Sequence, residues 1–276
     1  MPPTASDFVQ VSSPVPDPAG KQFSLPQEAF RLEVPEGWRQ GRGAFGGYVI
    51  AALTRATDQL ERDPARKLRS VTATIPAPVL SGPADVFVSP LRIGSGVSTW
   101  QALLVQEGEV RSQATLVYGR QRVDQQGWNP EPPTGQPHWS EVEVVGMRAP
   151  MGPEFAQHFE FRPTGPAPFS AGSKPIASGW IRNRPTLPRV SAADVLALLD
   201  AWWPASFALE TAPRPMATLT YTAELLADPD RLDDSPLYYR ARSEAMHGGF
   251  CAEFRELWTA GGTLVGLNQQ TFVMIR

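Results

Sequence analysis

Asp200 is the residue whose surroundings suggest chemistry most directly. It lies in residues 199–204, LDAWWP, where aromatic side chains follow a carboxylate. On a helix, Asp200 would lie at the edge of an arc that includes Leu196, Trp203 and Phe207. A carboxylate beside apolar groups is costly unless it is hydrogen-bonded, and desolvation makes it a better base toward water. The alternative is an exposed helix aspartate near an irregular turn.

Pro204 adds a backbone feature next to this acid. It lies four residues after Asp200 and has no N–H, so the Asp200 carbonyl loses its usual helical partner. We therefore expect the helix to bend or end here. A locally open backbone beside an aspartate could admit a water molecule.

Two expected helix N-termini could stabilise a developing negative charge. Gly46 and Gly47 precede one apolar helix, and Ser191 precedes another. Backbone N–H groups at a helix start are suitable donors to an oxyanion. For the two glycines, turn geometry and close packing are the alternative explanation.

Other catalytic chemistries find little support. The histidines His138, His158 and His247 are scattered, and no GxSxG nucleophile motif occurs. The single cysteine, Cys251, excludes an internal disulfide, and no metal-ligand spacing appears. Neither a GxGxxG fingerprint after a strand nor a P-loop is present. We expect no cofactor and no metal.

The elements that must position these residues occur twice along the chain. Residues 43–119 and residues 191–275 each predict one apolar helix followed by four strands, which indicates an internal duplication. The first helix should start at the glycines and run to about Arg62. The second should begin at Ser191, with Asp194 completing a capping box. The predicted strands are 68–76, 84–93, 98–106 and 110–118 in the first copy, and 216–226, 237–246, 250–259 and 263–275 in the second.

Composition and charge limit the class of protein. The chain has 276 residues, 42% of them hydrophobic, and a net charge of −3. Nucleic-acid binding therefore has no electrostatic support. No apolar run approaches the ~20 residues that span a bilayer, so we expect a cytoplasmic protein. Two helix-and-sheet units side by side predict an α+β fold with one continuous antiparallel sheet.

Four short stretches resemble one known family in order and approximate spacing. Residues 45–49, FGGYV, followed by an Ala-rich helix, resemble the start of the first hot dog repeat in the acyl-CoA thioesterase II (TesB-type) family. Asp200 resembles that family's helix aspartate. Residues 217–220, ATLT, resemble its next strand, and residues 269–274, QQTFVM, resemble its Gln-containing terminal strand. The resemblance covers about residues 30–119 and 155–276.

The resemblance implies a fold, an activity and a site. The fold is a double hot dog, in which one curved antiparallel sheet wraps two long helices. The activity is hydrolysis of acyl-CoA thioesters, a reaction of lipid metabolism, without a cofactor. The site residues carried over are Asp200, Thr218 and Gln270, which would hold a water molecule.

Some details of the site remain open at this stage. The family strand often continues with Asp-His, whereas this chain has Thr220 and Tyr221. We expect Thr220 to point to the same side as Thr218, so it could replace Thr218, and Gln269 to face away from Gln270. Expected substrate contacts are Gly46, Gly47, Thr220 and Trp203.

The expected organisation has four parts. Residues 1–22 would form a flexible segment, 23–120 the first repeat, 121–154 a linker, and 155–276 the second repeat with the site. Exposed sheet edges favour a homo-oligomer. Besides the hydrolase, a non-catalytic acyl- or CoA-binding protein of the same fold is the main alternative. An enoyl-CoA hydratase would need an Asp/His pair, and no histidine is placed for it.

Overall fold

The structure is a computed structural model, which describes residues 24–122, 128–147, 152–187 and 189–275. The predicted N-terminal segment 1–22 lies outside the described residues. Two helices, α2 (Gly46–Asp58) and α3 (Ala192–Asp200), accompany the strands. Four short 3-10 helices are η1 (Trp139–Glu141), η2 (Glu154–His158), η3 (Ala205–Ala208) and η4 (Pro229–Arg231).

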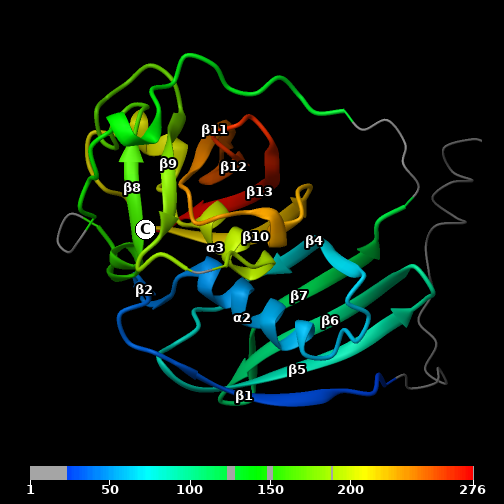
Figure 1. The fold of residues 1–276 in the computed structure, drawn as a ribbon. Coiled ribbons are helices and arrows are strands. Elements are labelled where there is room, and N and C mark those ends of the chain that lie inside the picture. The colour runs from blue at the N-terminus through cyan, green and yellow to red at the C-terminus, as the bar shows by residue number, and fades with distance from the viewer. Residues whose placement is uncertain (1–23, 123–127, 148–151, 188, 276) are drawn as a thin grey trace, which may run out of the picture.

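One antiparallel sheet of eleven strands forms the body of the molecule (Figure 1). Its strands, in sheet order, are β1 (Glu28–Val34), β5 (Gly82–Ile93), β6 (Val97–Gln106), β7 (Glu109–Arg120), β4 (Arg66–Thr74), β10 (Met216–Leu225), β13 (Leu264–Met274), β12 (Phe250–Trp258), β11 (Leu237–His247), β9 (Ile176–Asn183) and β8 (Phe159–Pro163). A separate pair, β2 (Arg39–Gln40) and β3 (Gly43–Ala44), leads into α2. The expected single continuous antiparallel sheet is confirmed.

The strand order repeats itself about the middle of the sheet. Outward from the central pair, one half runs β4, β7, β6, β5, β1 and the other runs β10, β13, β12, β11, β9. Strands β4 and β10 pair antiparallel and join the halves. This symmetry confirms the internal duplication, because equivalent strands follow the helix in the same chain order.

The two helices differ in length from the sequence expectation. Helix α2 ends at Asp58, four residues before the predicted end at Arg62. Helix α3 has nine residues, so the expectation of two long helices is wrong for α3. It begins with the predicted capping box, in which Ser191 and Asp194 satisfy each other's backbone N–H groups. It ends at Asp200, as Pro204 predicted, because a proline cannot donate to the last turn.

The helices run antiparallel and pack directly on each other. Helix α2 contacts β5, β6 and β7, and α3 contacts β9, β12 and β13. At the crossing, a Cβ placed on Gly47 would lie 3.0 Å from the Cα of Ala197. Arg55 near the end of α2 pairs with Asp194 near the start of α3, at 2.6 Å. The start of α2 is thereby brought to the end of α3.

No helix in the described part of the chain is long and apolar enough to cross a membrane. Both helices lie over the sheet (Figure 1), and their buried residues belong to one hydrophobic core that both repeats form. Leu53 of α2 and Leu199 of α3 are both fully buried in it.

We predict that Gly47→Ala destabilises the fold. The new methyl group would lie 2.4 Å from Cζ of Phe45 and 3.0 Å from the backbone of Ala197. Overpacking of this kind costs about 1–3 kcal/mol, which exceeds the helix propensity gained from alanine. The free energy of unfolding is measured by urea titration. Gly146→Ala is the control, since nothing lies within 4 Å of its Cβ position. Equal unfolding midpoints for the two variants would contradict close packing at Gly47.

Candidate active site

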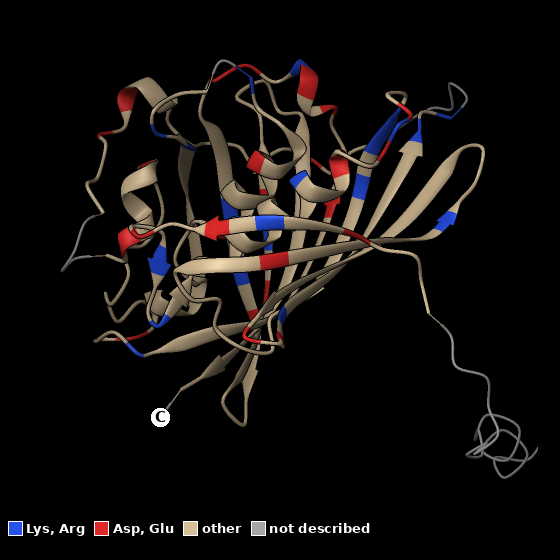
Figure 2. Ribbon diagram, turned by 90° about the horizontal axis from the view of Figure 1, so that it is seen from below, with Lys and Arg blue, Asp and Glu red and all other residues tan. Residues whose placement is uncertain are grey.

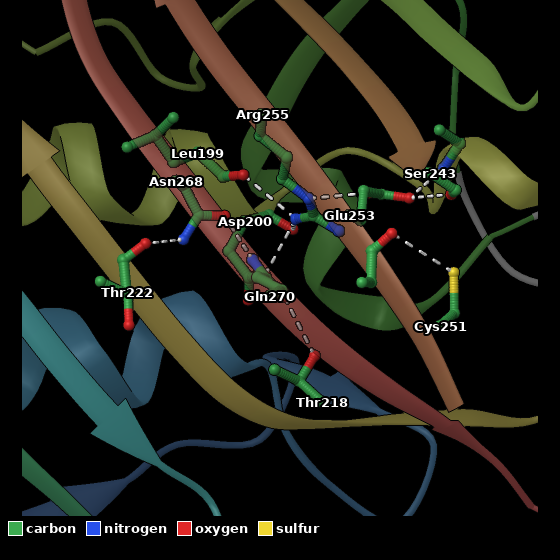
Figure 3. A network of polar contacts seen from close by, with 12 residues as sticks. Leu199, Asp200, Thr218, Thr222, Ser243, Cys251, Glu253, Arg255, Asn268 and Gln270 are labelled. Atoms are coloured by element: carbon green, nitrogen blue, oxygen red, sulfur yellow. Dashed lines mark hydrogen bonds and ion pairs between the residues drawn. The ribbon is translucent and has the colours of Figure 1, made fainter. Parts of the chain in front are cut away.

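The structure brings Asp200, Gln270 and Thr218 together in one hydrogen-bonded chain (Figure 3). Nε2 of Gln270 donates to Oδ1 of Asp200 at 2.7 Å. The hydroxyl of Thr218 donates to Oε1 of Gln270 at 3.3 Å. Asp200 is only 6% exposed and Gln270 is completely buried. Three side chains predicted from the sequence to act together therefore lie in mutual reach.

A β-bulge decides which threonine joins this chain. Strand β10 pairs with β13, and its register shifts between Thr218 and Thr220. The extra residue changes the side to which the following side chains point. Thr220 is therefore exposed, and Tyr221 is buried in its place. The expectation that Thr220 and Thr218 share a side is wrong for this reason.

Tyr221 belongs to the pair Thr220–Tyr221, which stands where the family strand often has Asp-His. Its hydroxyl donates to the carbonyl of Leu196 in α3 at 2.9 Å. Burial, and after it the carboxylate of Asp200, raise the pKa of Tyr221, so its phenol stays neutral. Tyr221 thus ties strand β10 to the helix that carries Asp200.

Asn268 fixes the orientation of the Gln270 carboxamide. Nε2 of Gln270 also donates to Oδ1 of Asn268 at 2.9 Å, and Nδ2 of Asn268 donates to the carbonyl of Thr222 at 2.8 Å. Both N–H groups of Gln270 thus point to acceptors, which leaves its Oε1 toward Thr218. Gln269 is exposed on the opposite side of the sheet, as predicted.

A buried arginine, Arg255, completes the surroundings of Asp200. Its Nη1 lies 3.1 Å from Oδ1 of Asp200, and its side chain is 1% exposed. The same nitrogen donates to the backbone carbonyls of Leu199 and Asp200, at 3.1 and 3.3 Å. Pro204 leaves the Asp200 carbonyl without a helical partner, and this carbonyl accepts a hydrogen bond from Arg255. The arginine therefore takes the place at which we expected a water molecule.

Glu253 holds the arginine in turn. Its Oε1 accepts from Nε of Arg255 at 2.9 Å, and its Oε2 accepts from the backbone N–H of Ala205 at 2.7 Å and from Ser243 at 2.8 Å. Burial alone would lower the pKa of Arg255, but the polar and negative groups around it, Tyr239, Glu253 and Asp200, raise it overall. Arg255 is therefore a permanent cation in this cluster.

The start of α2 approaches the carboxylate from the other repeat. A Cβ on Gly46 would lie 2.8 Å from Oδ2 of Asp200, so only glycine permits this approach. The positive end of the α2 dipole then lies beside the carboxylate. Gly47, by contrast, lies against Phe45 and Ala197 and serves the packing of the helices.

The remaining residues considered from the sequence lie elsewhere. Trp203 packs in an aromatic cluster with Phe161 and Trp202. His158 stacks on Trp38, His138 precedes the 3-10 helix η1, and His247 ends strand β11. No group of three or more potential metal ligands occurs among the described residues.

The register of the two repeats shows what the first repeat has at the equivalent positions. Bulges fall at matching points in β4 and β10 and in β5 and β11, which fixes the alignment. The first repeat is apolar at these four positions: the counterparts of Gln270, Glu253, Arg255 and Asn268 are Leu116, Trp100, Ala102 and Ala114. The polar cluster is thus confined to the second repeat.

Sequence reasoning missed Arg255, Glu253 and Asn268. A signal for them exists, because Asn268 and Gln270 share one side of β13, as Glu253 and Arg255 share one side of β12. Polar side chains at alternate positions on a side that is otherwise apolar indicate a buried polar cluster. Whether that side faces the core or the solvent, however, is set by the pairing of β13 with β10 and of β12 with β11.

Comparisons with known proteins find matches for both halves of the chain. A model of the acyl-CoA thioesterase C-terminal domain matches residues 126–274, and one of the N-terminal domain matches residues 34–119. A conserved protein of unknown function with a hot dog fold from Alicyclobacillus acidocaldarius superposes with a TM-score of 0.84 at 24% identity, covering 90% of this chain and 93% of that one.

Two named thioesterase relatives share the fold at lower identity. The tesB protein of Mycobacterium avium subsp. paratuberculosis has a TM-score of 0.73 at 18% identity, and acyl-CoA thioesterase II TesB2 of Mycobacterium marinum has 0.70 at 17%. Each pair covers 90% of this chain and 93% of the other. At these identities the superpositions show the fold. A search of curated proteins found no match.

We predict that Asn268→Asp destabilises the protein at neutral pH. The substitution replaces the donor to the Thr222 carbonyl by an acceptor and adds a carboxylate to a cluster that already holds Asp200 and Glu253. Loss of a buried donor costs about 1–3 kcal/mol, and charge repulsion adds to it. The loss should shrink as the pH falls and the new carboxyl is protonated. Urea unfolding at two pH values tests this.

Gln269→Glu is the matched control for that variant. It adds the same charge one residue further along β13, on the exposed side of the sheet. Its effect should stay within about 0.5 kcal/mol of wild type. Equal destabilisation by the two variants would show that the buried position of residue 268 and its donor bond to Thr222 do not contribute to stability.

Proposed function

We propose that this chain, which belongs to the acyl-CoA thioesterase family, hydrolyses acyl-CoA through a water molecule held by Asp200, Thr218 and Gln270. Family membership makes the protein a thioester hydrolase of unspecified substrate. The assignment of the three residues is our own step. The observation that carries it is the hydrogen-bonded chain from Thr218 through Gln270 to a buried carboxylate.

The carboxylate has one oxygen suited to act on water. Among the described residues, the hydrogen bonds to the Asp200 carboxylate all reach Oδ1. Oδ2 lies on the side of Gly46, where α2 begins. A water molecule there would donate one hydrogen to Oδ2 and the other to the Thr218 hydroxyl oxygen or to Oε1 of Gln270, because the N–H groups of Gln270 already have acceptors.

The reaction follows from this placement. Asp200 takes a proton from the water as the water oxygen attacks the thioester carbonyl carbon. The carbonyl oxygen gains negative charge, and the first amides of α2, at Gly46 and Gly47, are the nearest expected donors to it. Collapse of the tetrahedral intermediate breaks the carbon–sulfur bond. The CoA thiolate recovers the proton from Asp200, and the free acid leaves.

The expected substrate contacts divide into two groups. Gly46 is best placed, because it already borders Asp200. Thr220 faces solvent on the outer side of the sheet, and Trp203 belongs to an aromatic cluster, so neither supports a direct contact. An enoyl-CoA hydratase is disfavoured, because the hydrogen bonds to the Asp200 carboxylate among the described residues come from Arg255 and Gln270, and none comes from a histidine.

A cytoplasmic location and self-association remain proposals. Only one cysteine occurs in the sequence, and it is buried, which suits a reducing compartment. Lys and Arg positions are mixed with Asp and Glu positions along the ribbon in Figure 2, and the net charge of the chain is −3, so nucleic-acid binding has no electrostatic support. Strand β1 ends the sheet and pairs only with β5 among the described residues, so its outer edge is free for another copy of the chain.

We predict that Asp200→Asn lowers kcat for acyl-CoA hydrolysis by roughly 10²–10⁴-fold, because an amide cannot accept the proton of the water. Release of free thiol from acyl-CoA of several chain lengths is the measurement. Asp58→Asn is the control, since Asp58 ends the other helix and bonds Tyr118 instead. Unchanged turnover in Asp200→Asn would refute the site. Binding of acyl-CoA by the wild type without thiol release would instead favour a non-catalytic acyl-CoA-binding protein.

A second prediction separates the two threonines. Thr218→Val removes the hydroxyl that reaches Gln270 and should lower kcat roughly fivefold, the value of about 1 kcal/mol for one hydrogen bond. Thr220→Val makes the same change two residues away, on the exposed side of the bulge, and should leave kcat unchanged. The reverse result would mean that the bulge is absent in solution and Thr220 faces the site.

A further inference from the structure

We infer that Arg255, held by Glu253, is a positioning residue that fixes both the backbone and the side chain of Asp200. This inference rests on the proposed function, because it explains how the proposed base is kept in place. The two residues lie on the same side of β12, and β12 belongs to the second repeat. Neither residue belongs to the trio that the sequence suggested.

The contacts of a single nitrogen carry the argument. Nη1 of Arg255 reaches the carbonyl of Leu199 at 3.1 Å, the carbonyl of Asp200 at 3.3 Å and Oδ1 of Asp200 at 3.1 Å. A donor shared by the backbone and the side chain of one residue restricts its main-chain position and its rotamer together. With Oδ1 fixed in this way, Oδ2 must point toward Gly46.

The end of α3 requires such a donor. The last carbonyls of a helix have no intrahelical partner, and Pro204 removes the N–H that would have served Asp200. A cation at this end also offsets the negative pole of the helix dipole. Arg255 provides both at once. Its planar guanidinium additionally leaves Nε free for a second partner, which a lysine ammonium could not do in the same geometry.

Glu253 is that second partner, and it holds the arginine in place. It accepts from Nε of Arg255, and it also accepts from the N–H of Ala205, just after Pro204. Ser243 on β11 donates to the same carboxylate. The end of α3 and the chain segment that leaves it are therefore both bound to strand β12, through one arginine and one glutamate (Figure 3).

The first repeat shows that the fold itself does not require this pair. Its equivalent positions hold Ala102 for Arg255 and Trp100 for Glu253, and the same helix and strands form there. Counting from the helix caps, the residue equivalent to Asp200 is Thr54, whose hydroxyl donates to the carbonyl of Ile50 in its own helix. The buried Arg255–Glu253 pair therefore occurs in the repeat that carries Asp200, and the shared fold of the two repeats does not require it.

The test compares kinetics and stability in Arg255 variants. Arg255→Met should lower kcat for thiol release about 100-fold with little change in KM, because small displacements of a catalytic group cost about that much. Arg255→Lys keeps the cation and one donor, so it should recover part of kcat. Circular dichroism and thermal midpoints show whether each variant is folded.

Arg66→Met is the matched control. Arg66 is a similarly buried arginine of the first repeat, paired with Glu61 at 3.0 Å and 9% exposed. Its replacement should lower the thermal midpoint as Arg255→Met does, yet leave kcat within twofold of wild type. Equal kcat losses in both variants would mean that the loss at Arg255 comes only from lower stability, which would overturn the inference.

The pH profile supplies a readout that a purely structural role would not move. The charged and titratable groups packed around Asp200 are Arg255 and Glu253 on β12, Tyr221 on β10 and Tyr239 on β11. Burial raises the pKa of both tyrosines, so they stay neutral across the usable range. Arg255 and Glu253 are thus the charged members of this group.

Two variants should move the acid limb of kcat/KM in opposite directions. Arg255→Met removes a cation 3.1 Å from the Asp200 carboxylate, so the limb should move to higher pH. Glu253→Gln removes an anion and should move it to lower pH. Unmoved limbs in both variants would overturn the inference.

The design separates failure of this inference from failure of the proposed function. If wild type releases no thiol from any acyl-CoA, the proposed function fails, and a crystal structure of Arg255→Met decides the inference alone. A changed Asp200 rotamer and end of α3 would support it, and an unchanged carboxylate would overturn it. If Arg255→Met does not fold, Arg255→Lys and Glu253→Gln carry the same kinetic and structural test.

Discussion

The burial of one carboxylate at the end of a short helix is the constraint on which the rest of the site depends. Asp200 is 6% exposed, and a charge so far from water must be met by donors. Gln270 and Arg255 supply them from two neighbouring strands. Gly46 lets the positive end of the other helix come close. The buried side chains of Gln270 and Arg255 need further hydrogen-bond partners of their own. Asn268 provides one for Gln270, and Glu253 provides one for Arg255.

Duplication followed by divergence accounts for the distribution of polar groups. Both repeats build one helix and the same order of strands, with bulges at equivalent points. The second repeat places glutamine, glutamate, arginine and asparagine where the first places leucine, tryptophan and alanines. At these positions the first repeat contributes core packing, and the second accepts a less favourable interior for the sake of the proposed site.

The site nevertheless belongs to both halves. The carboxylate, hydroxyl and carboxamide come from the second repeat, but the helix N-terminus beside Oδ2 of Asp200 comes from the first. The antiparallel crossing of α2 and α3 makes this possible, and the crossing depends on Gly47 against Ala197. The packing of the two helices thereby sets the distance between the proposed base and the proposed oxyanion donors.

The sequence by itself determined which elements form and where α3 begins and ends, because these features depend on neighbours along the chain. Helical and alternating periodicity predicted both helices and the eight strands that follow them, Ser191 predicted a capped start, and Pro204 predicted the end of α3. Only the tertiary structure decided that Thr218 and not Thr220 meets Gln270, and that Arg255 meets Asp200. Those outcomes depend on a bulge and on cross-strand register, which bring together residues dozens of positions apart, and local patterns do not encode them.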